Sequence, residues 1–260
     1  MQIATWNVNS LKVRLPHVLQ WLVSKDIDVL CLQETKTIDE NFPVEALSEI
    51  NYNSFFDGQK TYNGVAILVK KSLKVEPGSL VKGITHFEDH QKRLIALTIN
   101  GIRVICGYFP NGESLTSDKF IYKINWLKAL HDMLKLEQEK HSNIILLGDF
   151  NIAPEDQDVH DPAAWLGKNL VSPEERLAFN QMIALGFYDA FRLFDQPEKS
   201  YSWWDYRMLG FKRNRGLRID HILISKALLP LCQFALIDKE PRELLQPSDH
   251  APVIVQLKTI

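Results

Sequence analysis

The sequence has little cysteine, no long apolar run and no low-complexity segment, and each absence excludes a class of protein. Cys31, Cys106 and Cys232 are odd in number and each lies in an apolar stretch, which is typical of buried reduced thiols and not of a disulfide framework. No apolar run approaches the length of a membrane span, and the N-terminus lacks the basic and apolar regions of a signal peptide. We therefore expect a cytoplasmic protein that binds no membrane.

The chain of 260 residues contains no Pro/Gly/Ser-rich linker and no shift in composition, so we expect one domain spanning 1–260. Hydrophobic residues make up 45% of the chain and charged residues 24%, as in ordinary globular proteins. The formal net charge of −2 does not by itself indicate a nucleic-acid binder. A cluster of acidic ligands can mask a basic face in this sum, so the distribution of charge is more informative.

Apolar runs of strand length dominate the chain, with a few helical segments between them. Strands are predicted at Gln2–Val8, Val29–Gln33, Gly64–Val69, Leu94–Asn100, Arg103–Phe109, Asn143–Gly148, Tyr201–Asp205, Arg218–Ser225 and Ala251–Leu257. Helices are predicted at Arg14–Ser24, Ser117–Lys140 and Ser172–Leu185. Asn100-Gly101 predicts a hairpin turn, and strands do not alternate strictly with helices. The pattern favours an α/β fold with largely antiparallel or mixed sheets and helices packed outside, and two such sheets face to face would bury all these runs.

Several of these apolar runs begin or end at acidic, amide or imidazole side chains. They are Asn7, Glu34, Asp149, Asn151, Asp220, Asp249 and His250. Strands can deliver the groups at their ends to one place, so these side chains could form a single site. Oxygen donors with one imidazole and no thiolate cluster suit a hard divalent cation and the hydrolysis of phosphate esters.

Two of these signals have plainer interpretations when taken alone. Asp149 and Asn151 lie two apart, on one face of an extended segment, but could instead form a turn or a helix cap. Asp249 and His250, before Pro252, could be a cap and a surface histidine. The joint occurrence of all the signals favours a metal-dependent hydrolase over these alternatives.

Three further features remain open in the same way. Asp220 is expected to be partly buried, where an imidazolium would be a natural partner, although a salt bridge with Arg218 is the alternative. Trp203 and Trp204 could be core residues or could face a ligand. The stretch Lys212–Arg218 has four cations in seven residues, which could form a solvated loop or a phosphate contact.

Five motifs, in this order and spacing, resemble the exonuclease III family of apurinic/apyrimidinic endonucleases, within the endonuclease/exonuclease/phosphatase superfamily. The motifs are Trp6-Asn7-Val8-Asn9-Ser10-Leu11-Lys12-Val13-Arg14-Leu15, Leu32-Gln33-Glu34-Thr35-Lys36, Gly148-Asp149-Phe150-Asn151-Ile152-Ala153-Pro154, Gly216-Leu217-Arg218-Ile219-Asp220 and Ser248-Asp249-His250-Ala251-Pro252. The resemblance covers essentially the whole chain and implies a four-layer α/β sandwich. The chain departs from the family pattern at His221, where many relatives have an apolar residue, and in the polar segment Asp156–Pro162 at the border of the cleft.

The resemblance implies a Mg²⁺ or Mn²⁺ cofactor and a catalytic set. The implied metal site comprises Asn7, Glu34, Asp149, Asn151, Asp249 and His250. The implied catalytic residues are Tyr108, Asp149, Asn151, Asp220 and His250. Asp149 would orient or deprotonate the attacking water, while Asn151 would hold the transition-state oxygens and Tyr108 would steady the phosphate or the leaving group. His250, paired with Asp220, would contact the scissile phosphate.

The resemblance also implies a substrate, which is double-stranded DNA with abasic sites, nicks or blocked 3′ ends. The implied DNA-binding residues are Trp203, Trp204, Tyr206, Arg207, Lys212, Arg213 and Arg215. Only one of the two tryptophans can face DNA if their segment is extended. The implied activity is base excision repair by a monomer that cleaves 5′ to abasic sites, with 3′→5′ exonuclease and 3′-end-trimming (phosphatase and phosphodiesterase) activity. The alternatives are a phosphatase of phospholipids or inositol phosphates, and a DNA-binding scaffold without activity.

Overall fold

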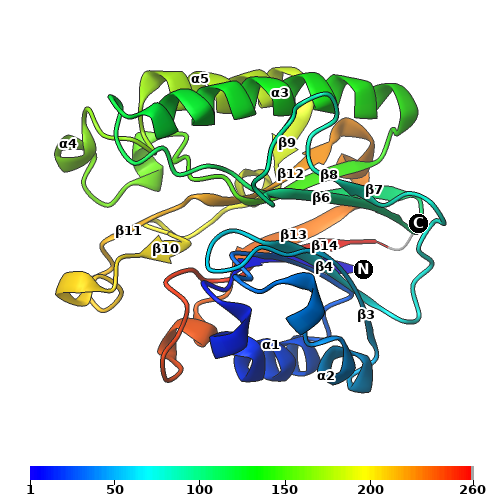
Figure 1. Ribbon diagram of the computed structural model, residues 1–260. Helices are drawn as coiled ribbons and strands as arrows, with labels where there is room; N and C mark the ends of the chain where they lie inside the picture. The colour runs from blue at the N-terminus through cyan, green and yellow to red at the C-terminus, as the bar shows by residue number, and fades with distance from the viewer. Residues whose placement is uncertain (259–260) are drawn as a thin grey trace.

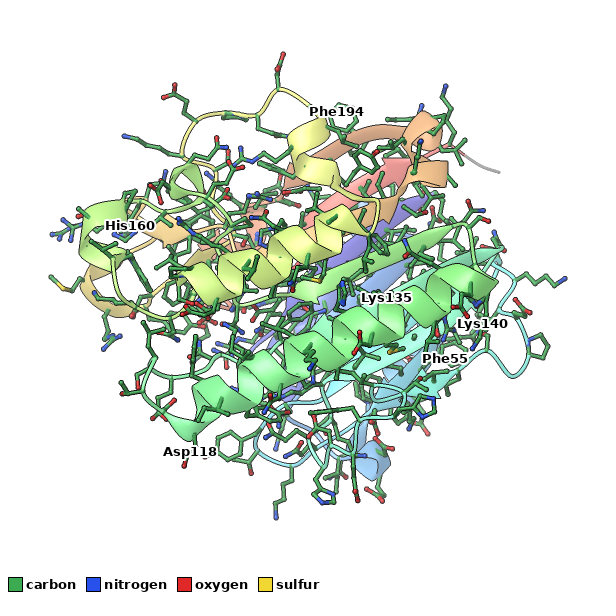
Figure 2. All side chains as sticks on the ribbon, turned by 90° about the horizontal axis from the view of Figure 1, so that it is seen from above. Phe55, Asp118, Lys135, Lys140, His160 and Phe194 are labelled. Carbon is green, nitrogen blue, oxygen red and sulfur yellow. The ribbon has the colours of Figure 1, made fainter. Side chains whose placement is uncertain are left out.

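The computed structural model describes residues 1–258, which form four layers (Figure 1). The helices are α1 (Leu11–Lys25), α2 (Val44–Glu49), α3 (Asp118–Lys140), α4 (Pro162–Trp165) and α5 (Pro173–Ala184). Helices α1 and α2 cover one six-stranded sheet, α3 and α5 cover the other, and the two sheets pack face to face. Seen from above, α3 and α5 lie side by side across their sheet (Figure 2). The predicted four-layer α/β sandwich is confirmed.

Each sheet is mixed, with one parallel pair of strands at its centre. Sheet A has the order β13-β14-β1-β2-β4-β3, with β1 Gln2–Asn7, β2 Val29–Gln33, β3 Tyr52–Asp57, β4 Val65–Lys70, β13 Cys232–Ile237 and β14 Val253–Leu257. Sheet B has the order β5-β6-β7-β8-β12-β9, with β5 Val81–Lys82, β6 Leu94–Ile99, β7 Ile102–Tyr108, β8 Ile144–Asp149, β9 Phe187–Asp189 and β12 Asp220–Ser225. The pairs β1–β2 and β7–β8 are parallel, and the other neighbours are antiparallel.

The sequence predicted every central strand of both sheets and missed all four edge strands, which are β13 and β3 in sheet A and β5 and β9 in sheet B. Central strands are buried on both faces and appear as continuous apolar runs, whereas an edge strand such as β13 keeps exposed positions at Phe234 and Leu236. The segment Tyr201–Asp205 forms a strand only at β10 (Trp203–Trp204), which pairs with β11 (Gly216–Leu217).

Local sequence and long-range contacts together determine where helices and strands begin and end. Asn100 and Gly101 have φ of 48° and 75° between β6 and β7, so the predicted hairpin turn is confirmed. Helix α1 begins three residues before the predicted Arg14. The main-chain N–H groups of Ser10 and Leu11 donate to carbonyls that follow β2, at 2.8 and 3.0 Å, and this long-range tie extends the helix.

The apolar core between the two sheets holds residues from both, including Cys31 of β2 and Cys106 of β7. Both thiols are buried and free, as predicted, and Cys232 is free and half-buried. A second apolar cluster lies between sheet B and helices α3 and α5, and a third lies between sheet A and helices α1 and α2. The expectation of one domain stays a prediction, which a single cooperative unfolding transition would bear out. Among residues 1–258, no helix combines the length and hydropathy needed to cross a bilayer.

Candidate active site

The polar groups that border the apolar runs meet at one end of the sandwich. The carboxyl ends of the parallel strands β1, β2, β7 and β8 lie there, together with the amino ends of their antiparallel neighbours β12 and β14. These strand ends deliver Asn7, Glu34, Tyr108, Asp149, Asp220 and His250. Helix α4 and the β10–β11 hairpin project from this end, and the two chain termini lie at the other (Figure 1).

Asn7 connects the two sheets across this end of the core. Its Nδ2 donates to Glu34 Oε1 at 2.8 Å and to Asp149 Oδ2 at 2.9 Å. Its Oδ1 accepts from the main-chain N–H of Asn9 at 3.0 Å, which fixes the orientation of the amide because a backbone N–H can only donate. Asn7 therefore presents a donor, not an oxygen ligand, to the two carboxylates. Its predicted role as a metal ligand stays a prediction.

Glu34, Asp149 and His250 are the groups among residues 1–258 that could surround a metal ion, since one ligand atom from each lies within 4.8 Å of the others. The donor chemistry divides this set. The two carboxylates offer hard oxygen ligands, which suit Mg²⁺ or Mn²⁺. The His250 Nε2 lies 3.8 Å from Asp149 Oδ2, within ion-pair distance. Glu34 and Asp149 thus fit a divalent cation best.

His250 is held by a buried carboxylate on its far side. Its Nδ1 lies 2.8 Å from Asp220 Oδ2, and Ser202 Oγ donates to the same oxygen at 2.7 Å. Burial alone would lower the pKa of His250, but Asp220 and Asp149 raise it to about 10. The imidazole is therefore a cation at neutral pH, with its Nε2–H directed toward Asp149. The predicted pairing of His250 with Asp220 is present.

Asp149 has an environment that suits a base. Burial is the largest cause that raises the pKa of this carboxyl, to about 7. The Asp220 and Glu34 carboxylates act in the same direction, whereas His250 and Asn7 lower it. A carboxyl that titrates close to neutrality can accept a proton from water and release it again, which is the property that general base catalysis requires.

Asn151 holds Asp149 in place from the loop that follows β8. Its main-chain N–H donates to Asp149 Oδ1 at 2.9 Å, and its Nδ2 lies 3.3 Å from Asp149 Oδ2. Asn111 Nδ2 donates to Asn151 Oδ1 at 3.0 Å, and Lys123 Nζ donates to the Asn151 carbonyl at 2.7 Å. Sequence reasoning missed Asn111, Lys123 and also Ser202. A lysine in an amphipathic helix looks like a surface residue, and only the packing shows that this one is buried.

Asp249 lies beside this cluster but bonds elsewhere. Its Oδ1 accepts from Asn9 Nδ2 at 3.0 Å and its Oδ2 accepts from Trp203 Nε1 at 2.9 Å. Burial would raise its pKa, but His250 and the Trp203 hydrogen bond lower it, so Asp249 is ionised. The structure uses this carboxylate to fix Trp203, and its predicted role as a metal ligand is not supported by the geometry.

Tyr108 borders the cluster from the end of β7. Burial, together with the Glu34 and Asp149 carboxylates, raises the pKa of its hydroxyl well above the usual range. Tyr108 is therefore a neutral hydrogen-bond donor, as the predicted contact with a phosphate or leaving group requires.

A cleft of about 670 Å³ opens directly above the cluster, between the loops that carry α4 and β10–β11. Of the predicted DNA-binding residues, Trp203, Arg207 and Arg215 line it. Trp204 is 0% exposed and packs in the interior, so its predicted contact with DNA is wrong. The remaining three, Tyr206, Lys212 and Arg213, are exposed outside this cleft.

Two other predictions are settled by the pairing of Arg218. This buried residue bonds to Asp158 Oδ1 and Asp189 Oδ2, both at 2.7 Å, so the alternative of a salt bridge with Asp220 is wrong. Arg218 also donates to His221 Nδ1 at 3.0 Å, which leaves His221 in the interior and away from the cleft. The polar segment after Asn151 does border the cleft, through His160.

Comparison with known proteins finds relatives along the full chain. A model of the Endonuclease/Exonuclease/phosphatase family matches residues 4–250. Exodeoxyribonuclease III of Haemophilus influenzae is 39% identical over 272 residues, which cover 99% of this chain and 100% of the relative. A 3′ phosphatase from Neisseria, solved with a product DNA hairpin, is 43% identical with a TM-score of 0.95 and 99% of each chain covered. An AP endonuclease from Archaeoglobus fulgidus is 35% identical with a TM-score of 0.93 and 99% of each chain covered.

Proposed function

Because this chain belongs to the endonuclease/exonuclease/phosphatase family, we propose that it is a metal-dependent DNA repair nuclease, which cleaves 5′ to abasic sites and trims 3′ ends. The similar proteins are named for exonuclease, 3′ phosphatase and AP endonuclease activities, and one was solved with a DNA product. One observation carries the proposal. Asp149, whose carboxyl has a pKa of about 7, faces the Glu34 carboxylate and the His250 imidazolium at the base of an open cleft.

In this proposal the chain's own residues divide the work of phosphodiester hydrolysis. Asp149 accepts a proton from the attacking water, and Asn151 acts through it by fixing both of its carboxylate oxygens. His250, kept cationic by Asp220, donates its Nε2–H to a phosphate oxygen on which negative charge develops. Tyr108 donates a hydrogen bond from its hydroxyl to the phosphate or to the leaving oxygen.

Glu34 and Asp149 would hold the divalent cation, which supplies positive charge to offset that of the phosphate as it is attacked. We propose Mg²⁺ as the resident ion because the two candidate ligands are carboxylates, with Mn²⁺ as a substitute. Lys36 Nζ lies 2.9 Å from Glu34 Oε2, so a cation at this carboxylate also has to displace or accommodate the ammonium group.

The cleft suits a nucleotide that has lost its base. Its wall combines the Trp203 ring with the apolar side chains of Leu170, Met208 and Ile219, next to the cationic Arg215. An abasic sugar has no base to unstack, so its extrusion into such a pocket costs little, while a normal nucleotide costs more. All of these residues come from one chain, and we propose that the enzyme acts on duplex DNA as a monomer.

The test is incision of a duplex with a central abasic analogue by Asp149→Asn and His250→Ala variants. We expect each variant to lose roughly 10³-fold or more of the rate while DNA binding remains, since a proton acceptor or a phosphate donor is removed. Nicked, blunt and abasic duplexes assayed side by side rank the activities. A rate within about tenfold of wild type for either variant would contradict the mechanism.

A further inference from the structure

His221 is a buried residue outside the proposed catalytic set, at a position where this chain departs from the family pattern. It lies in β12 opposite Gly148 of β8, and the two strands run side by side in sheet B (Figure 1). Successive side chains of a strand point to opposite faces of its sheet. Asp220, the preceding residue, holds His250 in the candidate site, so His221 points to the other face, where its ring meets Phe179 of α5.

Two hydrogen bonds fix the His221 ring. Its Nδ1 accepts from Arg218 Nη1 at 3.0 Å, because a guanidinium can only donate. Its Nε2 therefore carries the proton and donates to the Ile152 carbonyl at 2.8 Å. Among residues 1–258 that carbonyl has no other hydrogen-bond donor. Loss of the imidazole would therefore leave a buried acceptor unpaired, which costs more than the bond itself contributes.

The same ring contacts both chain neighbours of Asn151. It packs against the Phe150 ring, with centroids 5.1 Å apart at an interplanar angle of 65°, and it bonds to Ile152. Asn151 has a φ of 50°, a left-handed conformation that costs free energy and persists only where its surroundings hold it. His221 therefore supports, from both sides, the turn in which the Asn151 main-chain N–H donates to Asp149 Oδ1 at 2.9 Å.

Arg218 anchors His221 in the interior. Its Nη1 donates to Asp189 Oδ2 and its Nε to Asp158 Oδ1, both at 2.7 Å. Its main-chain N–H donates to the Asp158 carbonyl at 2.9 Å. Asp158 and Ile152 are the two ends of one loop, so Arg218 and His221 together hold both ends. This loop cannot shift without breaking buried, charge-assisted hydrogen bonds.

We propose that His221 is a positioning residue for phosphodiester hydrolysis, which acts through Asn151 on Asp149. Adjacent residues of β12 then hold two different reacting groups, since Asp220 orients His250 on one face of the sheet and His221 orients Asp149 from the other. An apolar side chain of similar size could fill the space but could not donate the hydrogen bond. The inference rests on the proposed function, in which Asp149 accepts a proton from the attacking water.

The test compares three variants with wild type. His221→Leu removes both hydrogen bonds, whereas His221→Gln keeps an acceptor for Arg218 and a donor for Ile152. The matched control is Leu47→Ala, which destabilises the protein at a buried position of α2, on the helix side of sheet A. Each protein is assayed by single-turnover incision of an abasic duplex at saturating Mg²⁺ and by its Kd for the duplex in EDTA. The assay temperature is one at which thermal unfolding shows every variant to be folded.

We expect His221→Leu to lower the single-turnover rate about 10- to 100-fold while Kd stays within about twofold, since the reacting groups are displaced and the contacts with DNA are not. His221→Gln should stay within about threefold of the wild-type rate, and Leu47→Ala should match wild type. Hydrogen exchange of residues 149–158, followed by mass spectrometry without DNA, should become at least about tenfold faster in His221→Leu and not in the control.

A rate for His221→Leu within about threefold of wild type, or unchanged exchange, would overturn the proposal. So would a rate for His221→Gln as low as that of His221→Leu, or equal slowing in Leu47→Ala at the same loss of melting temperature. If the leucine variant does not fold, His221→Met removes the same bonds with an adaptable side chain, and the same comparisons apply. Failure of wild type to incise abasic duplex would instead contradict the proposed function, and the exchange comparison, which needs no substrate, would still test whether His221 holds the loop.

Discussion

Lys123 and Glu175 form an ion pair in which both side chains are fully buried, beneath the loop that carries Asn151. Lys123 also lies within hydrogen-bond distance of the Asn111 carbonyl, at 3.3 Å. Glu175 completes the capping box of α5, where its Oε2 accepts from the main-chain N–H of Ser172 at 3.0 Å. The pair therefore joins α3 and α5 to the loop that holds Asp149 in place.

Lys123→Met should destabilise the protein by about 3–5 kcal/mol, because Glu175 would be left as an uncompensated buried charge. The double variant Lys123→Met/Glu175→Leu removes both charges and should regain most of the loss. Urea unfolding measures both, and kcat should fall more than KM changes because the Asn151 carbonyl loses its donor. A double variant no more stable than the single one would contradict this account.

His221 should make the protein less stable in mild acid. Burial, and then Arg218, lower its pKa to about 4. Its Nδ1 accepts from Arg218, so its Nε2 carries the proton and donates to the Ile152 carbonyl at 2.8 Å. In the unfolded chain the imidazole takes up a proton near pH 6.5. The stability is therefore present above about pH 6.5 and lost as pH falls toward about 4.

The size of this effect follows from the slope of about 1.4 kcal/mol per pH unit for one proton. Between about pH 6.5 and about pH 5, His221 should cost about 2 kcal/mol of unfolding free energy. His221→Gln cannot titrate, so its stability should fall less over the same range, by about that amount. Urea unfolding of both proteins at the two pH values measures the difference, and parallel losses would refute the assignment.

Alanine substitutions at Trp203 and Trp204 should distinguish a residue that contacts substrate from a residue that packs in the core. Trp204→Ala should cost about 3–5 kcal/mol of stability, because its fully buried ring packs against Phe211 and Tyr201. Trp203→Ala should lower the melting temperature less than Trp204→Ala does, and it should weaken binding of abasic duplex by about tenfold, as expected for one lost ring contact. Thermal unfolding and anisotropy decide the case, and the reverse pattern would contradict the structure.

Glu34→Gln should raise the Mg²⁺ concentration required for half-maximal incision by at least about tenfold, because a charged ligand becomes a neutral amide of the same shape. The matched control is Glu113→Gln, an exposed carboxylate that lines the same cleft and pairs with Lys119. Binding of Mn²⁺ followed by electron paramagnetic resonance gives a readout that is independent of activity. Equal metal affinity for Glu34→Gln and the control would exclude Glu34 as a ligand.

Much of the fold could be predicted from local sequence, in a pattern that has a physical reason. The central strands are buried on both faces, so their sequences are continuously apolar and easy to identify. The edge strands have one face or one edge in solvent, and Tyr52–Asp57 or Cys232–Ile237 carry no such signal. The capping box at Ser172 and the turn at Asn100-Gly101 were predictable because their partners lie within three residues.

The candidate site divides in the same way. The pattern of apolar runs alone placed Asn7, Glu34, Asp149 and His250 at strand ends, and the family motifs identified them as candidate site residues. What each atom bonds to was not predictable, because the partners are far apart along the chain: Asn7 bonds to a residue 142 positions away, and Asn9 to one 240 positions away. These long-range contacts turn Asn7 into a donor and direct Asp249 to Trp203.

By itself, the sequence determined the sandwich's inner strands, the residue types at their ends and the kind of chemistry that those types allow. Only the tertiary structure decided which buried carboxylate has a pKa near neutrality, which tryptophan faces the cleft and which lysine lies in the core. The reason is that periodicity and caps act over a few residues, whereas solvation, and with it charge state, depends on everything that packs around a group.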